Sequence, residues 1–87
     1  MIVIDCRHFS TREAAHAYIA DTLGFPEYYG SNLDALFDCL TELKNGTRVA
    51  LLNSGLAKEQ LGEYGKKLLR VFDAAAGENP GISLFYF

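Results

Sequence analysis

The sequence predicts a small α/β domain of two layers, with a three-stranded parallel sheet and helices packed on it. Apolar runs typical of strands, at residues 1–5, 47–53 and 82–87, alternate with helical patterns along the chain. A helix between two strands is the usual connection in a parallel sheet. If both connections are right-handed and move in the same direction, the strand order is 1-2-3 and all helices share one face. With 87 residues the chain can build one core, so we expect a single domain over residues 1–87.

The first strand and the first helix have clear sequence signals. Met1–Asp5 is a run rich in β-branched residues, which predicts a strand buried on at least one face. Ser10 followed by Glu13 is a capping box, which predicts the start of a helix that reaches about Leu23. The glycine and proline that follow Leu23 are expected to end this helix.

The second half of the chain is expected to supply the other two strands and two more helices. Thr47–Asn53 is the most continuously apolar stretch of the middle region, which favours the central strand. A short helical piece near Leu56–Leu61 precedes a longer helix over about Tyr64–Ala76. Gly77 and the proline after it are expected to end that helix, and Ile82–Phe87 closes the chain as the last strand.

Composition excludes several classes of protein. Apolar residues make up 49% of the chain and charged residues 22%, which are globular values and exclude disorder. The N-terminal sequence MIVIDCRHF has no basic segment followed by a long apolar run, so it predicts no secretory signal. No apolar run approaches the roughly 20 residues that span a bilayer. We therefore expect a cytoplasmic protein that does not enter membranes and is a monomer when free.

The cysteines and histidines predict neither a disulfide framework nor a metal site. Cys6 and Cys39 are too few for such a framework and lack the CxxC spacing, so we expect reduced thiols that pack as small apolar groups. His8 and His16 are expected to be ordinary surface or capping histidines. No metal, cofactor or catalytic residue is predicted.

Charge is distributed unevenly along the chain. From Glu13 to Leu43 there are six acidic residues and no Lys or Arg, whereas the other residues carry all eight basic side chains. An acidic segment attracts basic surfaces and repels nucleic acid. The pattern therefore favours a basic protein as partner and excludes nucleic acid, although an acidic face exposed only to solvent would give the same count.

The centre of this acidic segment is predicted to be a helix from Leu33 to about Leu43, with Asn32 as its N-cap. At 100° per residue the helix has a leucine-rich face, which is expected to face the core. Phe37 falls at the edge of that face, so both a core position and the rim of a binding surface stay open. The opposite face gathers four polar side chains: Asp34, Asp38, Thr41 and Glu42.

The acidic face is not what a purely structural helix requires. Asp34 and Asp38 are like charges one turn apart, which costs a few tenths of a kcal/mol. Asp34 lies in the first turn, where the helix dipole favours an anion, but Asp38 and Glu42 have no such benefit. Because the helix contains no Lys or Arg, the compensating cations are expected on another molecule.

The loop before this helix has the composition of a contact surface. Tyr28 and Tyr29 are large side chains with a polar tip, the type enriched at interface hot spots. One of two consecutive tyrosines in a loop usually packs in the core, so the surface role is open between them, with Tyr28 favoured. Gly30 permits a positive φ or the close approach of another backbone.

The segment LGFPEYYGSNLDALFDCLTEL closely resembles the centre of the barstar-like family of intracellular inhibitors of secreted bacterial ribonucleases. The match is dense over about 20 of the 87 residues, and the order of strands and helices around it is compatible with the family. The resemblance implies a barstar-like fold in which this loop and helix enter the active site of the enzyme. The matching residues in this chain are Tyr28, Tyr29, Gly30, Asn32, Asp34, Asp38 and Thr41.

Within this resemblance, Asp38 matches the carboxylate that replaces a substrate phosphate, and Asp34 matches its flanking acidic contact. Three positions depart from the family's founding member: Phe37 and Leu43 stand where it has Trp, and Glu42 stands where it has Gly. The contacting Glu of the last helix corresponds to Ala74 here. These departures leave the inhibitor role in place and put the identity of the target enzyme in doubt.

The sequence therefore predicts an inhibitor that blocks a cationic ribonuclease site with an acidic helix and the Tyr-Tyr-Gly loop before it. The expected partner is a basic ribonuclease of the extracellular type. The alternative is a barstar-like module that binds a basic protein other than a ribonuclease. An enzyme is not expected. Two carboxylates without a nearby His, Lys or third ligand are too few groups for an acid/base or magnesium site, and Asp5, His8 and Ser10 form no credible catalytic triad.

Overall fold

A parallel sheet forms one layer of the molecule, and the computed structural model describes all residues from Met1 to Phe87. The strands are β1 (Ile2–Asp5), β2 (Thr47–Leu52) and β3 (Ile82–Tyr86), in the order β1-β2-β3. In the central strand, Val49 pairs with Ile2 on one side and with Leu84 on the other. The predicted fold class and strand order are confirmed.

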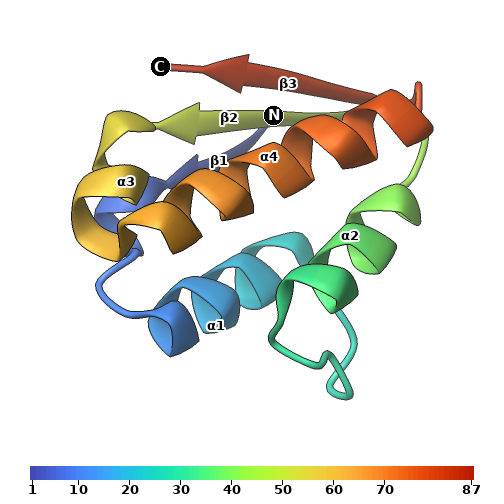
Figure 1. Cartoon of the computed structure of the whole chain (residues 1–87). Coiled ribbons are helices and arrows are strands. Elements are labelled where there is room, and N and C mark those ends of the chain that lie inside the picture. Colours follow the sequence, from blue (N-terminus) through green and yellow to red (C-terminus); the bar gives the residue numbers. More distant parts are fainter.

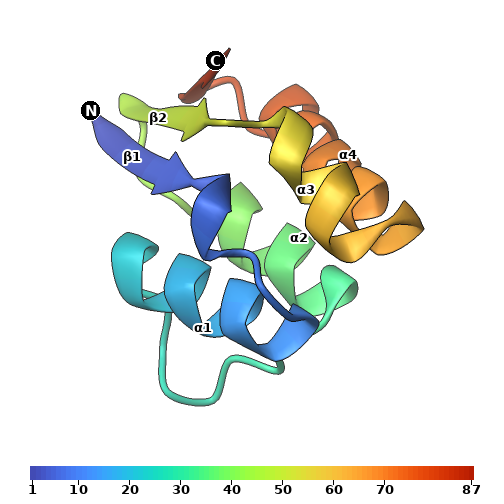
Figure 2. The ribbon, with the colours of Figure 1, turned by 90° about the vertical axis from the view of Figure 1, so that its left-hand side faces the viewer.

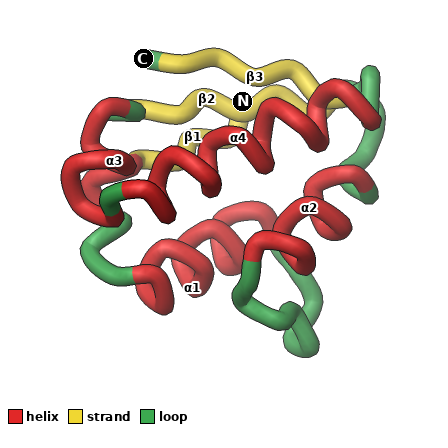
Figure 3. The backbone as a smooth tube through the Cα atoms, in the orientation of Figure 1, coloured by secondary structure: helices red, strands yellow, loops and turns green.

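The helices form the second layer, on one face of the sheet (Figures 1 and 2). They are α1 (Arg12–Leu23), α2 (Leu33–Thr41), α3 (Gly55–Leu61) and α4 (Glu63–Glu78), and a single 3-10 turn, η1 (Cys6–His8), follows β1. The short α3 lies at the end of the sheet where β2 stops (Figure 3). No helix in the structure has the length and apolar character needed to cross a membrane.

The core lies between the two layers. Every element except β3 supplies at least one residue that is fully buried, such as Ile4, Leu36, Leu51 and Phe72, and β3 supplies Ile82, which is 7% exposed. Burying a side chain of this size stabilises the fold by roughly 1.5–3 kcal/mol relative to leaving it in water. The leucine face of α2 is part of this core, as predicted, because Leu36 and Leu40 are both buried.

Several predicted helix ends are wrong by one or two residues. The N-cap of α1 is Thr11 rather than Ser10, because the Thr11 hydroxyl accepts the Ala14 amide at 3.0 Å. The second helix ends at Thr41 rather than Leu43, and the next two amides bond carbonyls three residues back, which tightens the last turn. Gly77 does not end α4, which continues to Glu78.

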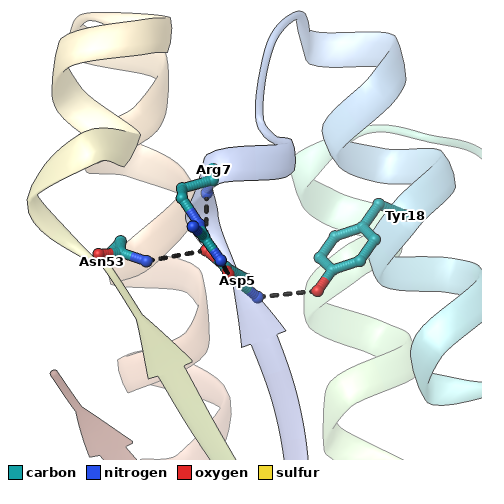
Figure 4. A network of polar contacts seen from close by, with 4 residues as sticks. All are labelled: Asp5, Arg7, Tyr18 and Asn53. Atoms are coloured by element: carbon teal, nitrogen blue, oxygen red, sulfur yellow. Dashed lines mark hydrogen bonds and ion pairs between the residues drawn. The ribbon is translucent and has the colours of Figure 1, made fainter.

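A polar network joins the C-terminal ends of β1 and β2 (Figure 4). The Asp5 carboxylate accepts hydrogen bonds from the Arg7 guanidinium at 2.7 Å and from the Asn53 side-chain amide at 3.0 Å. The Asp5 backbone amide donates a hydrogen bond to the Tyr18 hydroxyl at 2.8 Å. The hydrogen bonds from Arg7, and then the one from Asn53, hold the pKa of Asp5 well below its ordinary value of 3.8. The network is therefore a structural link between strands that is weakened at strongly acidic pH, once Asp5 becomes protonated.

The C-terminal end of α2 is held by one side chain from the end of α4. Asn79 donates its amide to the backbone carbonyls of Thr41 and Leu43, both at 3.0 Å. The last carbonyls of a helix have no partner inside the helix, so this contact satisfies groups that would otherwise need water. The end of α2 that carries the predicted site is therefore fixed by a residue 36–38 positions later in the chain.

Replacing Asn79 with alanine is expected to destabilise the fold by about 1–3 kcal/mol, because two partly buried carbonyls lose their donor. Urea unfolding followed by circular dichroism measures this change. Asn45→Ala is the matched control, since Asn45 is exposed and its side chain makes no hydrogen bond within the chain. Equal stability of the two variants would contradict the assigned role of Asn79.

Candidate partner-binding site

The predicted site residues lie together on α2 and on the loop between α1 and α2, at one end of the helical layer (Figure 1). Six of them are exposed: the helix cap Asn32 and five residues that we call the acidic surface, which are Tyr28, Gly30, Asp34, Asp38 and Glu42. Asp34 and Asp38 are one helical turn apart and therefore lie on the same side of α2. The helix thus presents its acids to solvent and its leucines to the core.

No carboxylate of the acidic surface has a partner within the chain. The two ion pairs of the structure, Arg7 with Asp5 and Lys66 with Glu63, involve other residues. The side chains of Asp34, Asp38 and Glu42 also accept no hydrogen bond from the chain. These acids therefore contribute negative potential to the surface without a local cation to offset it.

A depression of about 260 Å³ lies between the loop and α2. Its walls combine aromatic and apolar groups with two carboxylates, and it is lined by Pro26, Tyr28, Tyr29, Gly30, Ala35, Asp38, Cys39 and Glu42. The volume suits one side chain of a partner. The lining suits a flat, positively charged side chain, because an aromatic face and a carboxylate both attract a cation.

The two tyrosines of the loop face in different directions. Tyr28 is 88% exposed, whereas Tyr29 is partly buried, packs against the core and places its ring 5.1 Å from that of Phe25. Burial raises the pKa of the Tyr29 hydroxyl, so it stays protonated in the physiological range. Tyr28 therefore is free to contact a partner, and Tyr29 anchors the loop beneath it.

The backbone of the loop is ordered by its own hydrogen bonds. The Tyr29 amide donates to the Pro26 carbonyl at 3.0 Å, and the Asn32 side chain caps α2 by accepting the Ala35 amide at 2.8 Å. The positive φ that was considered for Gly30 occurs instead at Ser31, with φ of 52°. A Cβ atom on Gly30 would lie only 3.2 Å from the Asn32 amide nitrogen, so this glycine allows close packing against the cap.

The remaining predicted site residues are less accessible. Phe37 is partly buried and packs against the core. Thr41 is partly exposed, and its hydroxyl donates to the Asp38 carbonyl at 2.8 Å. Neither position excludes a contact at the rim of the acidic surface.

The last helix carries no acid at the position where the family resemblance implies a contacting Glu. Ala74 is exposed where the family resemblance implies a contacting Glu, and the neighbouring Asp73 accepts a hydrogen bond from the Tyr86 hydroxyl. Burial raises the pKa of Tyr86, and the hydrogen bond to Asp73 raises it further. The acidic surface therefore rests on α2 and its preceding loop alone.

Neither thiol has the properties of a reactive cysteine. Both cysteines are free. Burial raises the pKa of Cys6 to about 11, and burial also raises the pKa of Cys39, helped by the nearby Glu42 and Asp38. At neutral pH both thiols are protonated, and protonated thiols are poor nucleophiles.

Sequence analysis missed His16, which was expected at the surface or at a cap. The imidazole is only 1% exposed and bonds Tyr29 of the loop at 2.6 Å. Helical periodicity gave a partial signal, because Ala15 and Ile19 on either side of it are predicted and observed to be buried. Its hydrogen-bond partners lie 13 and 48 residues away, which no local pattern reveals.

Comparisons with known proteins identify the family of the chain. The sequence model of the barstar family, described as "Barstar (barnase inhibitor)", matches residues 1–87. A protein of Bacillus subtilis (strain 168) named "Putative ribonuclease inhibitor YrdF" is 41% identical over 78 residues, which cover 88% of this chain and 86% of that protein.

Proposed function

The chain belongs to the barstar family, and on that premise we propose that it inhibits a basic ribonuclease by inserting the acidic surface into the enzyme's active site. The family is one of inhibitors rather than enzymes. The observation that carries the proposal is the set of exposed carboxylates on α2 that have no cation within the chain.

The mechanism is mimicry of the substrate by charge and shape. A ribonuclease must hold the phosphates of RNA with cationic groups, and carboxylates at Asp34 and Asp38 can accept hydrogen bonds from the same groups. The inhibitor offers no phosphodiester bond, so the enzyme has nothing to cleave. Asp38, next to the depression, takes the position of a phosphate, and Asp34 supports it from one turn away.

Tyr28 and the depression add shape to this charge. The exposed Tyr28 ring and the Asp38 carboxylate line the same hollow, where one flat cationic side chain of the enzyme would be enclosed. Aromatic anchors of this kind commonly dominate the energy of protein interfaces. Phe37, Thr41 and Glu42 lie around this centre and would adapt the surface to one particular enzyme.

Pre-organisation of the surface supports tight binding. Asn32 caps α2, Tyr29 anchors the loop in the core, and Asn79 fixes the other end of the helix. A surface that is already ordered loses little conformational entropy when it binds. We propose that the protein acts as a monomer in the cytoplasm, where it protects the cell from a secreted-type ribonuclease before export.

The inhibitor is expected to bind its ribonuclease less tightly as the salt concentration rises, because dissolved ions screen the attraction between oppositely charged surfaces. Raising the salt concentration from 50 to 500 mM should reduce the association rate by about tenfold or more, with a smaller effect on dissociation. Surface plasmon resonance against barnase-type ribonucleases measures both rates.

The same chain, immobilised, would distinguish the two candidate partners. Capture at low salt followed by elution at high salt should recover a basic protein with ribonuclease activity. Recovery of a basic protein without that activity would instead support the alternative, a barstar-like module with another basic partner. An association rate independent of salt would contradict charge-driven binding in either case.

A further inference from the structure

The buried imidazole of His16 joins three separate elements of the fold. His16 lies in α1 and is 1% exposed. Its Nδ1 atom is 2.6 Å from the hydroxyl oxygen of Tyr29, which belongs to the loop of the acidic surface. Its Nε2 atom is 2.6 Å from the hydroxyl oxygen of Tyr64, in the first turn of α4. Both ring nitrogens are therefore used.

A neutral imidazole fits this chain of bonds, because each tyrosine hydroxyl can then keep its own hydrogen-bond direction. A neutral imidazole has one N–H donor and one acceptor nitrogen. One tyrosine hydroxyl therefore donates to the ring, and the ring donates to the other hydroxyl. A protonated ring donates from both nitrogens, so the tyrosine that had been the donor must turn its hydroxyl proton away or break the contact.

We propose that His16 is a positioning residue for the loop between α1 and α2, and that protonation of its imidazole loosens this loop from α1 and α4. This inference rests on the proposed function and concerns how the acidic surface is held. Tyr29 lies between Tyr28 and Gly30, both exposed members of that surface. A shift of Tyr29 therefore moves the two residues that line the depression beside Asp38.

The surroundings of His16 favour the neutral form. Burial lowers the pKa of His16 below its ordinary value of 6.5, and Glu13 of the same helix opposes this effect. The loop and α4 present the hydroxyls of Tyr29 and Tyr64 to the ring, and the Arg12 guanidinium lies 4.2 Å from the centre of the Tyr64 ring. Cys39 of α2 lies close enough to Tyr29 to affect the pKa of Tyr29, and the Cys39 thiol is protonated at neutral pH.

The sign of the pH effect follows from this shift. The unfolded chain binds a proton at His16 near pH 6.5, whereas the folded chain binds it only at lower pH. The stabilisation is therefore fully present above pH 6.5 and is lost as the pH falls below that value. The loop should loosen over the same pH range in which the His16 ring of the folded chain takes up its proton.

The first test uses the free protein and needs no ribonuclease. NMR spectroscopy follows the His16 ring protons and the amide exchange of residues 25–32 between pH 8 and pH 5. Amide exchange of the loop, corrected for its intrinsic pH dependence, should rise at least fivefold as the His16 ring titrates. His8→Gln should keep this response, because His8 is the exposed histidine of the chain, whereas His16→Gln should remove it. A loop that exchanges identically in the two variants would overturn the proposal.

The second test measures binding. Affinities are compared between variants at the same pH, so that titration of the ribonuclease itself cancels. Glutamine has one amide donor and one carbonyl acceptor, so His16→Gln should bind within about threefold of the wild type at pH 8, whereas His16→Leu should bind about tenfold more weakly. At the pH where NMR shows the His16 ring to be protonated, the wild type should lose about tenfold more affinity than His16→Gln does. Equal pH dependence of the two would contradict the proposal.

Tyr64→Phe provides a variant that keeps the histidine and a ring of nearly the same shape. It should increase the amide exchange of the loop at pH 8, because His16 loses one of its two partners. An unchanged loop would contradict the role of this chain of bonds. If the wild type inhibited no ribonuclease, the proposed function would fail, while the NMR measurements would still decide whether His16 positions the loop.

Discussion

Asp38→Ala is expected to weaken inhibition of the target ribonuclease by roughly thirtyfold to several thousandfold, or about 2–5 kcal/mol of binding free energy. The Asp38 carboxylate is exposed, has no partner within the chain and lines the depression of the acidic surface. In the complex it is expected to meet cations that hold phosphate in the enzyme. Removing it leaves those cations buried and unpaired, which is the main source of the loss.

The fold should tolerate this change. Asp38 makes no side-chain hydrogen bond or ion pair, and its removal relieves repulsion with Asp34, so the free energy of unfolding should change by less than about 0.5 kcal/mol. Glu59→Ala on α3 is the matched control, because it removes the same charge from an exposed position outside the acidic surface. Inhibition titrations should separate the two variants clearly. Equal inhibition would remove Asp38 from the mechanism.

Gly65→Ala is expected to destabilise the fold by about 3 kcal/mol or more. Gly65 is buried in α4, where the helix crosses α3. A Cβ atom at this position would lie 1.9 Å from the backbone oxygen of Ala57 and 2.4 Å from its carbonyl carbon. Backbone atoms cannot rotate away as a flexible side chain can, so α3 and α4 must separate. Denaturant unfolding measures the effect, and failure to fold would be its extreme form.

Gly77→Ala provides the matched control in the same helix. A Cβ atom on Gly77 would meet nothing within 4 Å, and its φ is not positive. Alanine is the better helix former by roughly 0.5–1 kcal/mol, so this substitution should leave the stability unchanged or raise it. If both glycine variants had the same stability, close contact between α3 and α4 would not be the reason for glycine at Gly65.

The fold could be predicted from the sequence because its signals are local or follow from general rules of topology. The apolar runs at 1–5, 47–53 and 82–87 identify all three strands, and right-handed connections then give their order and the side of the helices. Helix ends were less certain, because Ser10 and Thr11 are both good caps and only the three-dimensional geometry shows that Thr11 is used.

The candidate site was only partly accessible to sequence reasoning. Periodicity placed Asp34 and Asp38 on the solvent side of α2, since alternation between core and surface is set by the helix itself. The supports of the site depend on contacts between distant residues. Asn79 holds the end of α2, and Tyr64 reaches the loop through His16, and neither residue carries a local motif for that role.

Competition with a mononucleotide tests the central claim most directly. A 3′-mononucleotide occupies the phosphate-binding active site of a ribonuclease, and the chain can be titrated into the enzyme at increasing nucleotide concentrations. If the acidic surface enters that site, the apparent dissociation constant of the inhibitor should rise in proportion to the nucleotide concentration once the site is saturated. An apparent constant that does not change with nucleotide would show that the two bind at different places and would contradict the account.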